Sequence, residues 1–314
     1  MIINNTVFDG NCFNDNSFFI CSVGYEERSF YILNKIKKDL DNRYMVFAFS
    51  EFINMTNKPK RIIDEHINKK NIVDISYDEI EVFFEKIKFL IMEFKEKHDK
   101  IELHIDYSYM PRQWYCKLPR FLLGLLSNED EVFFWYSEGI YPKNFKDYPT
   151  AGIDSFIYFS GKTSLRTNLK RTHLLSLSYD IIRTEGVVSI LDPENFIVCC
   201  AYDSDSIIIK QNVSKINKSL ISRAKMCVYT HLDDFQLMLS KLCEVVNDFW
   251  RLGDVIIIPD GPKPLIFAMS LIPDFLDKHG VICMQIIRTN RNTTPIDVSP
   301  SGKIVGFSIT YPNN

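Results

Sequence analysis

Short apolar runs alternate with amphipathic segments along the first half of the chain. Runs such as FFICS at 18–22 and YMVFAFS at 44–50 are almost continuously apolar, which is typical of strands buried on both faces. The segment DEIEVFFEKIKFLIMEFKEK at 78–97 instead repeats apolar residues at helical spacing. This alternation predicts an α/β fold, in which a mainly parallel sheet is covered by helices on both faces.

The same two patterns divide the rest of this half into elements. The expected strands lie at 18–22, 44–50, 71–76, 101–108 and 131–137. The expected helices lie at 26–40, 58–70, 78–97 and 111–126. Because Pro119 lies inside the last helix, we expect that helix to be distorted or split in two.

The second half of the chain repeats the first. The matched segments are ICSVGYEERS (20–29) with LLSLSYDIIRT (174–184), IELHIDYSYMPRQWY (101–115) with VIIIPDGPKPLIF (255–267), and TAGIDSFIYFSG (150–161) with SPSGKIVGFSIT (299–310). The offset between matched residues falls only from 154 to 150 along the chain. The alternative is that any two α/β domains share such an alternation, but here polar positions agree as well. We therefore expect two duplicated Rossmann-like units, 1–165 and 166–314, arranged as a pseudo-dimer about a two-fold axis.

Composition and charge narrow the class of protein. The 314 residues are 46% hydrophobic and 13% aromatic, which argues for a large core and against intrinsic disorder. A net charge of −3 argues against a protein that coats nucleic acid, and the basic segment at 160–173 reads as a solvated linker or as a local nucleic-acid contact. Most of the eight cysteines lie in apolar runs without a CxxC pair, as expected for thiols in a reducing compartment. Without a signal peptide or a membrane-spanning run, the sequence predicts a cytoplasmic protein.

Unusual residues follow two strands in each half, at the edge where open parallel sheets bind ligands. After the first strand the candidates are Ser22, Gly24, Tyr25 and Arg28, matched by Ser176, Tyr179 and Arg183. After the fourth strand they are Asp106, Ser108 and Arg112, matched by Asp260, Gly261 and Lys263. Arg112 and Lys263 each follow a proline at the start of a helix, where free N–H groups and the helix dipole favour a phosphate or carboxylate. The alternative is a rigid helix-starting turn with a solvated cation.

Two pairs of candidates leave two interpretations open. Arg28 and Arg183 would either flank a ligand cleft or pair with neighbouring carboxylates. Tyr25 and Tyr179 would either stack on a base or cap the sheet edge. His104 lies within an expected strand and reads more simply as a core residue than as a base. Since known catalytic, cofactor-binding and metal-binding motifs are missing, we expect no cofactor and no metal.

DGPKPLIFAMSL at 260–271 resembles the fourth-strand motif of the CRISPR-associated Rossmann-fold (CARF) domains and their fused SAVED relatives, and ICSVGYEERS is similar in placement to their first-strand motif. The resemblance implies that two Rossmann units hold a cyclic oligonucleotide across a pseudo-two-fold axis. Carried over by position, it points to Ser22, Gly24, Ser108, Arg112, Ser176, Gly261 and Lys263. The chain shows no fused nuclease or membrane effector, so a sensor of this kind would signal to a separate protein.

Three functions follow from these observations. The first is a sensor or regulatory subunit that binds a nucleotide-type anion between the two halves and signals to a separate effector, in prokaryotic antiviral defence. The second is a non-catalytic scaffold subunit of a multi-protein defence complex, in which the matched loops have no ligand. The third is an enzyme that acts on a phosphorylated nucleotide, for which the chain nominates no clear base or nucleophile. We expect the first, with no membrane as partner and with nucleic acid as a less favoured partner.

Overall fold

A computed structural model describes residues 1–10, 13–36, 40–49, 67–140, 152–163, 170–178, 180–202, 213–288 and 298–312. The chain divides into two compact units, which are described separately. The first unit combines Met1–Lys146 with Thr294–Asn314, and the second is Asp147–Thr293. Each unit is an α/β domain built on one mainly parallel sheet with flanking helices, which confirms the expected fold class.

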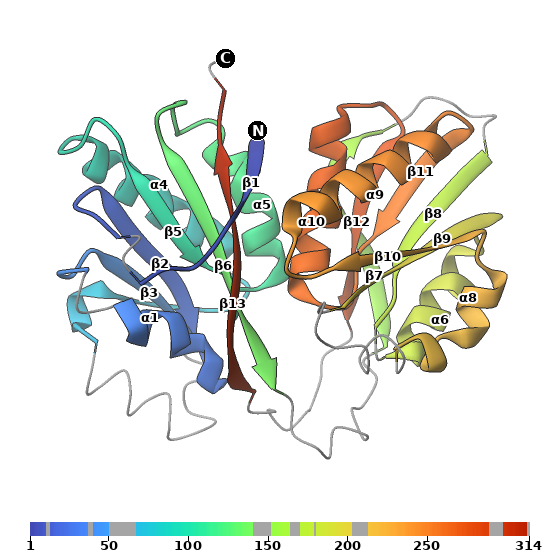
Figure 1. The fold of residues 1–314 in the computed structure, drawn as a ribbon, viewed down its shortest axis with the longest axis horizontal. Helices are drawn as coiled ribbons and strands as arrows, with labels where there is room; N and C mark the ends of the chain where they lie inside the picture. The colour runs from blue at the N-terminus through green and yellow to red at the C-terminus, as the bar shows by residue number, and fades with distance from the viewer. Residues whose placement is uncertain are drawn as a thin grey trace. The chain divides into compact units, whose positions relative to one another are not determined.

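The first unit contains a seven-stranded sheet in the order β1-β13-β6-β5-β2-β3-β4 (Figure 1). Its strands are β1 (Ile2–Thr6), β2 (Ser17–Val23), β3 (Tyr44–Phe49), β4 (Ile72–Ile75), β5 (Glu102–Asp106), β6 (Glu131–Ile140) and β13 (Ser299–Thr310). Its helices are the 3-10 turns η1 (Glu27–Phe30) and η2 (Lys69–Asn71) and the α-helices α1 (Tyr31–Ile36), α4 (Ile80–Lys95) and α5 (Arg112–Leu122). The strands β2 to β6 are parallel, whereas β13 runs antiparallel to β6 and to β1.

Alternating side chains of the first sheet bury two separate apolar layers. On one face, Cys21 and Val46 pack with Leu33 of α1 in a single buried cluster. On the other face, Phe47 contacts Phe83 of α4 at 4.8 Å between ring centroids. Because neighbouring residues of a strand point to opposite faces, α1 and α4 must cover different faces of the sheet.

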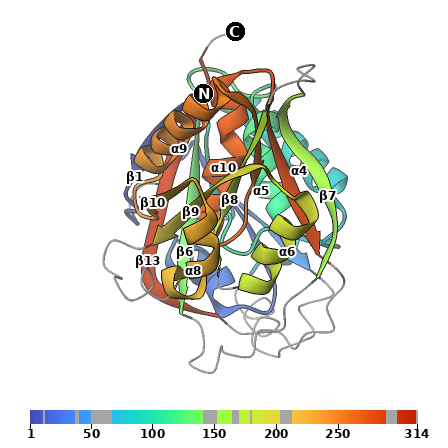
Figure 2. The same cartoon turned by 90° about the vertical axis from the view of Figure 1, so that its right-hand side faces the viewer.

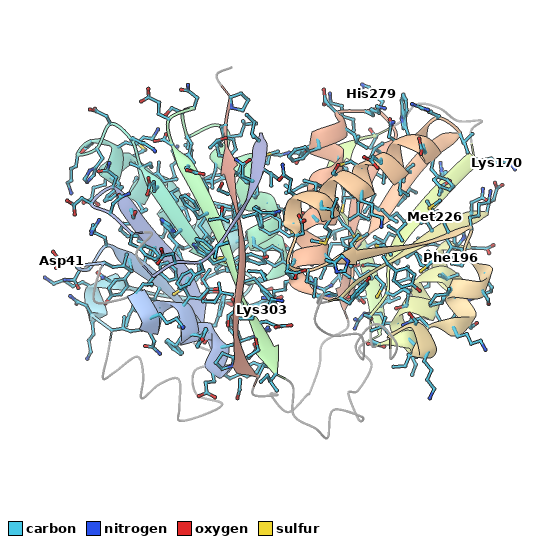
Figure 3. The ribbon with its side chains drawn as sticks, in the orientation of Figure 1. Asp41, Lys170, Phe196, Met226, His279 and Lys303 are labelled. Atoms are coloured by element: carbon cyan, nitrogen blue, oxygen red, sulfur yellow. The ribbon has the colours of Figure 1, made fainter. Side chains whose placement is uncertain are left out.

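The second unit contains a six-stranded sheet in the order β10-β9-β8-β11-β12-β7. Its strands are β7 (Ile153–Lys162), β8 (Lys170–Ser176), β9 (Asn195–Tyr202), β10 (Met226–His231), β11 (Gly253–Ile258) and β12 (Val281–Arg288). Its helices are α6 (Ile181–Leu191), α8 (Lys218–Arg223), α9 (Phe235–Trp250) and α10 (Lys263–Leu276). Figure 2 shows α6 and α8 beside each other, and both bury side chains in one cluster with β8 and β9. The parallel strands β8, β9 and β10 start at the same edge, where Figure 3 labels Lys170, Phe196 and Met226.

The two sheets have the same strand order. Reading from β4 in the first unit and from β10 in the second, each sheet places its parallel strands in the repeat order 3-2-1-4-5, followed by an antiparallel strand; the first sheet adds β1 beyond that strand. This is the order of the doubly wound dinucleotide-binding folds, in which the direction of strand succession reverses between strands one and four. The topology therefore agrees with the repeat in the sequence.

The division of the chain differs from the expected boundary at residue 165. The strand β7 follows β6 in the chain but pairs with β12 of the second sheet, whereas β13 follows β12 but pairs with β6 of the first sheet. Each repeat thus ends with a strand that belongs to the other sheet. The sequences of β7 and β13 match each other, so either strand could form the antiparallel hydrogen bonds at the edge of either sheet.

Two helices differ from the sequence expectation, and a third lies mostly outside the described residues. The segment expected as a helix at 26–40 begins with η1 and continues as α1, while 37–39 lie outside the described residues. The expected helix at 58–70 lies mostly outside them as well. The helix α5 runs through Pro119 without a split and ends three residues later at Leu122, since the proline lies in the last turn and removes few helical hydrogen bonds.

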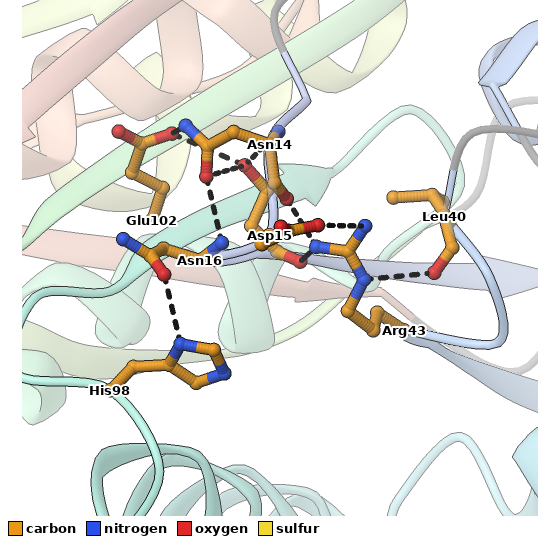
Figure 4. A network of polar contacts seen from close by, with 8 residues as sticks. Asn14, Asp15, Asn16, Leu40, Arg43, His98 and Glu102 are labelled. Atoms are coloured by element: carbon orange, nitrogen blue, oxygen red, sulfur yellow. Dashed lines mark hydrogen bonds and ion pairs between the residues drawn. The ribbon is translucent and has the colours of Figure 1, made fainter.

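A polar network closes the amino ends of strands in the first sheet (Figure 4). Asn14 donates a hydrogen bond to Glu102 at 2.8 Å, and the ring of His98 contacts the side-chain oxygen of Asn16 at 2.8 Å. Arg43 donates to the carbonyl oxygen of Leu40 at 3.2 Å. These groups bind one another, so the amino edge of this sheet is occupied by structural contacts.

Candidate functional site at the carboxyl edges of the sheets

The topological switch point of each unit lies between its first and fourth repeat strands. In the first unit these are β2 and β5, and in the second they are β8 and β11 (Figure 1). The segments that leave the carboxyl ends of these strands carry the candidate residues identified in the sequence. Open α/β sheets bind ligands in the crevice at this edge, so these segments define the candidate site.

In both units, the helix after the fourth strand starts with a proline followed by a cationic residue. Pro111 is the N-cap residue of α5 and Pro262 is the N-cap residue of α10, and neither makes a side-chain capping hydrogen bond. Arg112 and Lys263 are the first residues of the two helices. The first N–H groups of a helix lack partners inside the helix, so an uncapped start next to a cation favours an anion.

Strand pairing establishes how the two loops correspond. Cys21 pairs with Asp106 across β2 and β5, and Leu175 pairs with Ile258 across β8 and β11. Since Ser22 matches Ser176, Ser108 corresponds to Asp260, so the sequence match of Asp106 with Asp260 was wrong. The reason is loop length, because five residues separate β5 from α5 but only four separate β11 from α10.

In the second unit, the candidate residues bind one another. The guanidinium group of Arg183, which is 6% exposed, donates to Asp260 from Nε at 2.7 Å and contacts Asp180 through Nη1 at 2.7 Å. The hydroxyl of Ser176 donates to the carbonyl oxygen of Asp260 at 2.5 Å and accepts a hydrogen bond from its N–H group. These contacts tie the loop after β8 to the loop after β11. Arg183 therefore fits the carboxylate-pairing interpretation, although it is buried.

The glycine of the second unit has a conformational role. Gly261 has φ +88°, and a Cβ atom there would approach the carbonyl oxygen of Leu177 at 2.9 Å. Both facts favour glycine without reference to a ligand. Tyr179, the remaining candidate of this loop, lies outside the described residues.

In the first unit, Arg28 and Ser108 are also bound internally. Arg28, 5% exposed, pairs with Glu26 at 2.5 Å and donates to the hydroxyl of Tyr136 at 3.1 Å. Ser108 donates to the carboxylate of Asp106 at 2.5 Å and accepts from the N–H of Ser137 at 2.7 Å. Arg28, Asp106 and Ser108 therefore hold the ends of β2, β5 and β6 together.

Ser22 differs from its counterpart in the second unit. Its side chain is 1% exposed, and its hydroxyl has no hydrogen-bond partner within the described part of the chain. Cys21 and Val23 lie in the cluster under α1, so Ser22 points to the opposite face of the sheet. The matched Ser176 uses its hydroxyl to bind the loop after β11. Within the described residues, the first unit thus leaves a buried hydroxyl unused at the carboxyl end of β2.

Tyr109 covers the glycine of the first loop. A Cβ atom on Gly24 would lie 2.2 Å from the ring of Tyr109. The Tyr109 hydroxyl accepts a hydrogen bond of 3.4 Å from the N–H of Tyr25, and the two rings meet edge to face at 5.7 Å. Burial raises the pKa of Tyr109 far above its usual range, so its hydroxyl stays protonated. Gly24 is therefore required by the close approach of an aromatic ring.

A row of aromatic side chains lies at this edge, of which only Tyr25 was identified from the sequence. Phe49 ends β3 and lies 6.1 Å from the ring of Tyr77, which follows β4, and 6.0 Å from the ring of Tyr109, which follows β5. Tyr25, which follows β2, extends the row by its contact with Tyr109. The signal was an aromatic residue at or just after the carboxyl end of each of these strands.

Other chemical groups of the described residues offer no alternative centre. His104 is fully buried in β5, accepts a hydrogen bond from Trp135 at 3.2 Å and has its pKa lowered to about 3 by burial, which favours the core interpretation. The cysteines within the described ranges are free thiols. Across the described ranges there is no group of three or more side chains arranged to hold a metal ion. No helix within them is both long and apolar enough to cross a membrane.

The fold and the site thus rest on strand order, strand register and side-chain contacts. The strand order is that of a dinucleotide-binding fold, and the two switch points carry related loops with different contents. In comparisons with known proteins, no family model matches the chain and no curated protein is significantly similar to it.

Proposed function

We propose that the protein binds a nucleotide-type anion at the carboxyl edge of the first sheet and acts as a sensor or regulatory subunit for a separate effector protein. The observation that carries this proposal is the start of α5, where Arg112 is the first residue and the N-cap Pro111 makes no side-chain capping hydrogen bond, together with the buried hydroxyl of Ser22 at the end of β2, which has no partner among the described residues. A phosphate there would accept hydrogen bonds from the first-turn N–H groups, from Arg112 and from Ser22.

A binding role is favoured over catalysis by the state of the titratable groups. Glu26 and Asp106 are the carboxylates of the candidate loops in this unit, and both bind neighbouring side chains at 2.5 Å. His104 is buried under aromatic rings and has a pKa of about 3. A general base needs access to the proton that it abstracts, whereas His104 is buried and Glu26 and Asp106 are held by neighbouring side chains.

The experiment is thermal unfolding of the whole protein with inorganic phosphate, mononucleotides, dinucleotides and cyclic oligonucleotides, the last being the class that the CARF resemblance implies. A ligand that binds only the folded state at 100 times its Kd should stabilise it by about 2.7 kcal/mol. Arg112→Ala should abolish the shift, whereas Lys263→Ala, the matched change in the second unit, should retain it. A shift that survives Arg112→Ala would contradict the proposal.

A scaffold role is the second candidate, and the buried contacts of Arg183 with Asp180 and Asp260 favour it for the second unit. Those contacts satisfy the loops without a ligand. A well-folded protein that shows no shift with any nucleotide would extend this role to the whole chain. The search would then turn to a protein partner, by co-purification from the native host.

A further inference from the structure

In the aromatic row at the carboxyl edge of the first sheet, the ring of Tyr77 is exposed and contacts the buried ring of Phe49. The ring of Phe49 is buried and contacts Tyr77 and Tyr109 on either side. Tyr77 is 47% exposed, while Tyr25 and Tyr109 are half-buried. A large exposed ring resting on a fixed buried ring is a stacking surface at low conformational cost, because its orientation is already set.

The row is continuous with the anion site through a single loop. Tyr109 and Pro111 both belong to the loop between β5 and α5, and Arg112 follows directly. Three residues of chain span at most about 11 Å, so Tyr109 and the start of α5 lie within reach of one nucleoside monophosphate. Ser22 provides an independent indication of a ligand, because its buried hydroxyl lacks a partner among the described residues, whereas the matched Ser176 binds the loop after β11.

The second unit differs from the first at the position of Tyr109. Gly261 stands where register places Tyr109, and Ser178 stands where it places Gly24. Tyr202 and His231, at the carboxyl ends of β9 and β10, contact each other at 4.8 Å between ring centroids. The second unit thus keeps a cation at the helix start but has a glycine, and no aromatic ring, in the loop position of Tyr109.

We infer that Tyr25, Tyr77 and Tyr109 form a base-stacking subsite, so that the ligand of the first unit is a nucleotide with its base on the tyrosine row and its phosphate at α5. This inference rests on the proposed function, since it adds the base to the anion. Stacking on an aromatic side chain contributes about 1–3 kcal/mol per base, which corresponds to about 5- to 150-fold in Kd.

The test compares AMP, ribose 5-phosphate and inorganic phosphate by isothermal titration calorimetry on the whole protein. AMP should bind about 5- to 150-fold more tightly than ribose 5-phosphate. Tyr77→Ala should remove that preference while leaving the Kd for ribose 5-phosphate unchanged, and Tyr77→Phe should keep it because the ring remains. Tyr158→Ala, a change at a similarly exposed tyrosine of β7, is the matched control and should leave all three affinities unchanged.

The outcomes separate the two proposals. Equal binding of AMP and ribose 5-phosphate, with both lost in Arg112→Ala, would overturn the stacking subsite and retain the anion site. A preference for AMP that survives Tyr77→Ala would also overturn the subsite. Failure of all three probes to bind the folded protein would overturn both proposals together.

Discussion

The carboxyl edges of the two sheets have the same topology but carry different side chains with different contacts. In the second unit, Ser176, Arg183 and Asp260 satisfy one another, and the loop before α10 turns on Gly261. In the first unit, the corresponding serine has no partner in the described part of the chain, and Tyr109 fills the position of Gly261. A duplicated fold thus supports a closed polar cluster in one copy and an aromatic edge with an unused hydroxyl in the other. This difference is the reason for assigning the proposed ligand site to the first unit.

The largest expected effect comes from Asp260→Ala. Arg183 would keep Asp180 but lose its second carboxylate while remaining 6% exposed, and an incompletely paired buried charge typically costs about 3–5 kcal/mol. Urea unfolding followed by far-UV circular dichroism should show a lower midpoint at an unchanged slope. The matched control is Glu93→Ala, which removes an exposed pair with Lys97 and should cost less than about 1 kcal/mol. Equal effects of the two changes would show that the Arg183 cluster does not stabilise the second unit.

Two glycine substitutions test whether the glycines of the two loops have different roles. Gly24→Ala should destabilise the protein by about 1–3 kcal/mol, because the new methyl group collides with the ring of Tyr109. Gly261→Ala should cost a similar amount for another reason, since its φ of +88° strains any other residue.

A double-mutant cycle distinguishes these causes. Tyr109→Ala should rescue most of the stability lost in Gly24→Ala but none of that lost in Gly261→Ala, as measured by urea unfolding. If the effects of Gly24→Ala and Tyr109→Ala were simply additive, the close approach of ring and glycine would not explain Gly24.

Acid sensitivity should come from a buried histidine in each unit, because burial lowers the pKa of His104 in the first unit and lowers the pKa of His173 to about 4 in the second. Burial lowers the pKa of His104 to about 3, against about 6.5 in an unfolded chain. Below pH 6.5 the unfolded chain therefore binds a proton that folded His104 does not, so stability falls with pH by about 1.4 kcal/mol per unit, or about 2 kcal/mol from pH 6.5 to pH 5. His104→Gln should remove the His104 part of this dependence, measured by tryptophan fluorescence in urea, and His173→Gln should remove the part that arises in the second unit.

The repeat, the fold class and the helix starts at Arg112 and Lys263 could be predicted from the sequence, because they depend on local periodicity and on prolines that mark helix starts. The exchange of β7 and β13 could not, since matched strands suit either edge and only long-range pairing decides between them. The internal binding of Arg28 and Arg183 was one of two open interpretations. The tyrosine row, apart from Tyr25, was missed because its members lie far apart in the chain and meet only when parallel strands end at one edge.

The smallest expected effect concerns the two matched serines. Ser176→Ala removes a hydroxyl that binds both backbone groups of Asp260, so it should destabilise the protein by about 1 kcal/mol. Ser22→Ala removes a buried hydroxyl without a partner among the described residues, and its effect on stability should be near zero or slightly favourable. For ligand affinity we expect the opposite: Ser22→Ala should weaken binding more than Ser176→Ala, because the Ser176 hydroxyl already binds the backbone of Asp260. Urea unfolding of the two variants measures their stability, and calorimetric titration with AMP measures their affinity. A loss of stability in Ser22→Ala without a loss of affinity would place Ser22 with the structural serines and remove the main difference between the two edges.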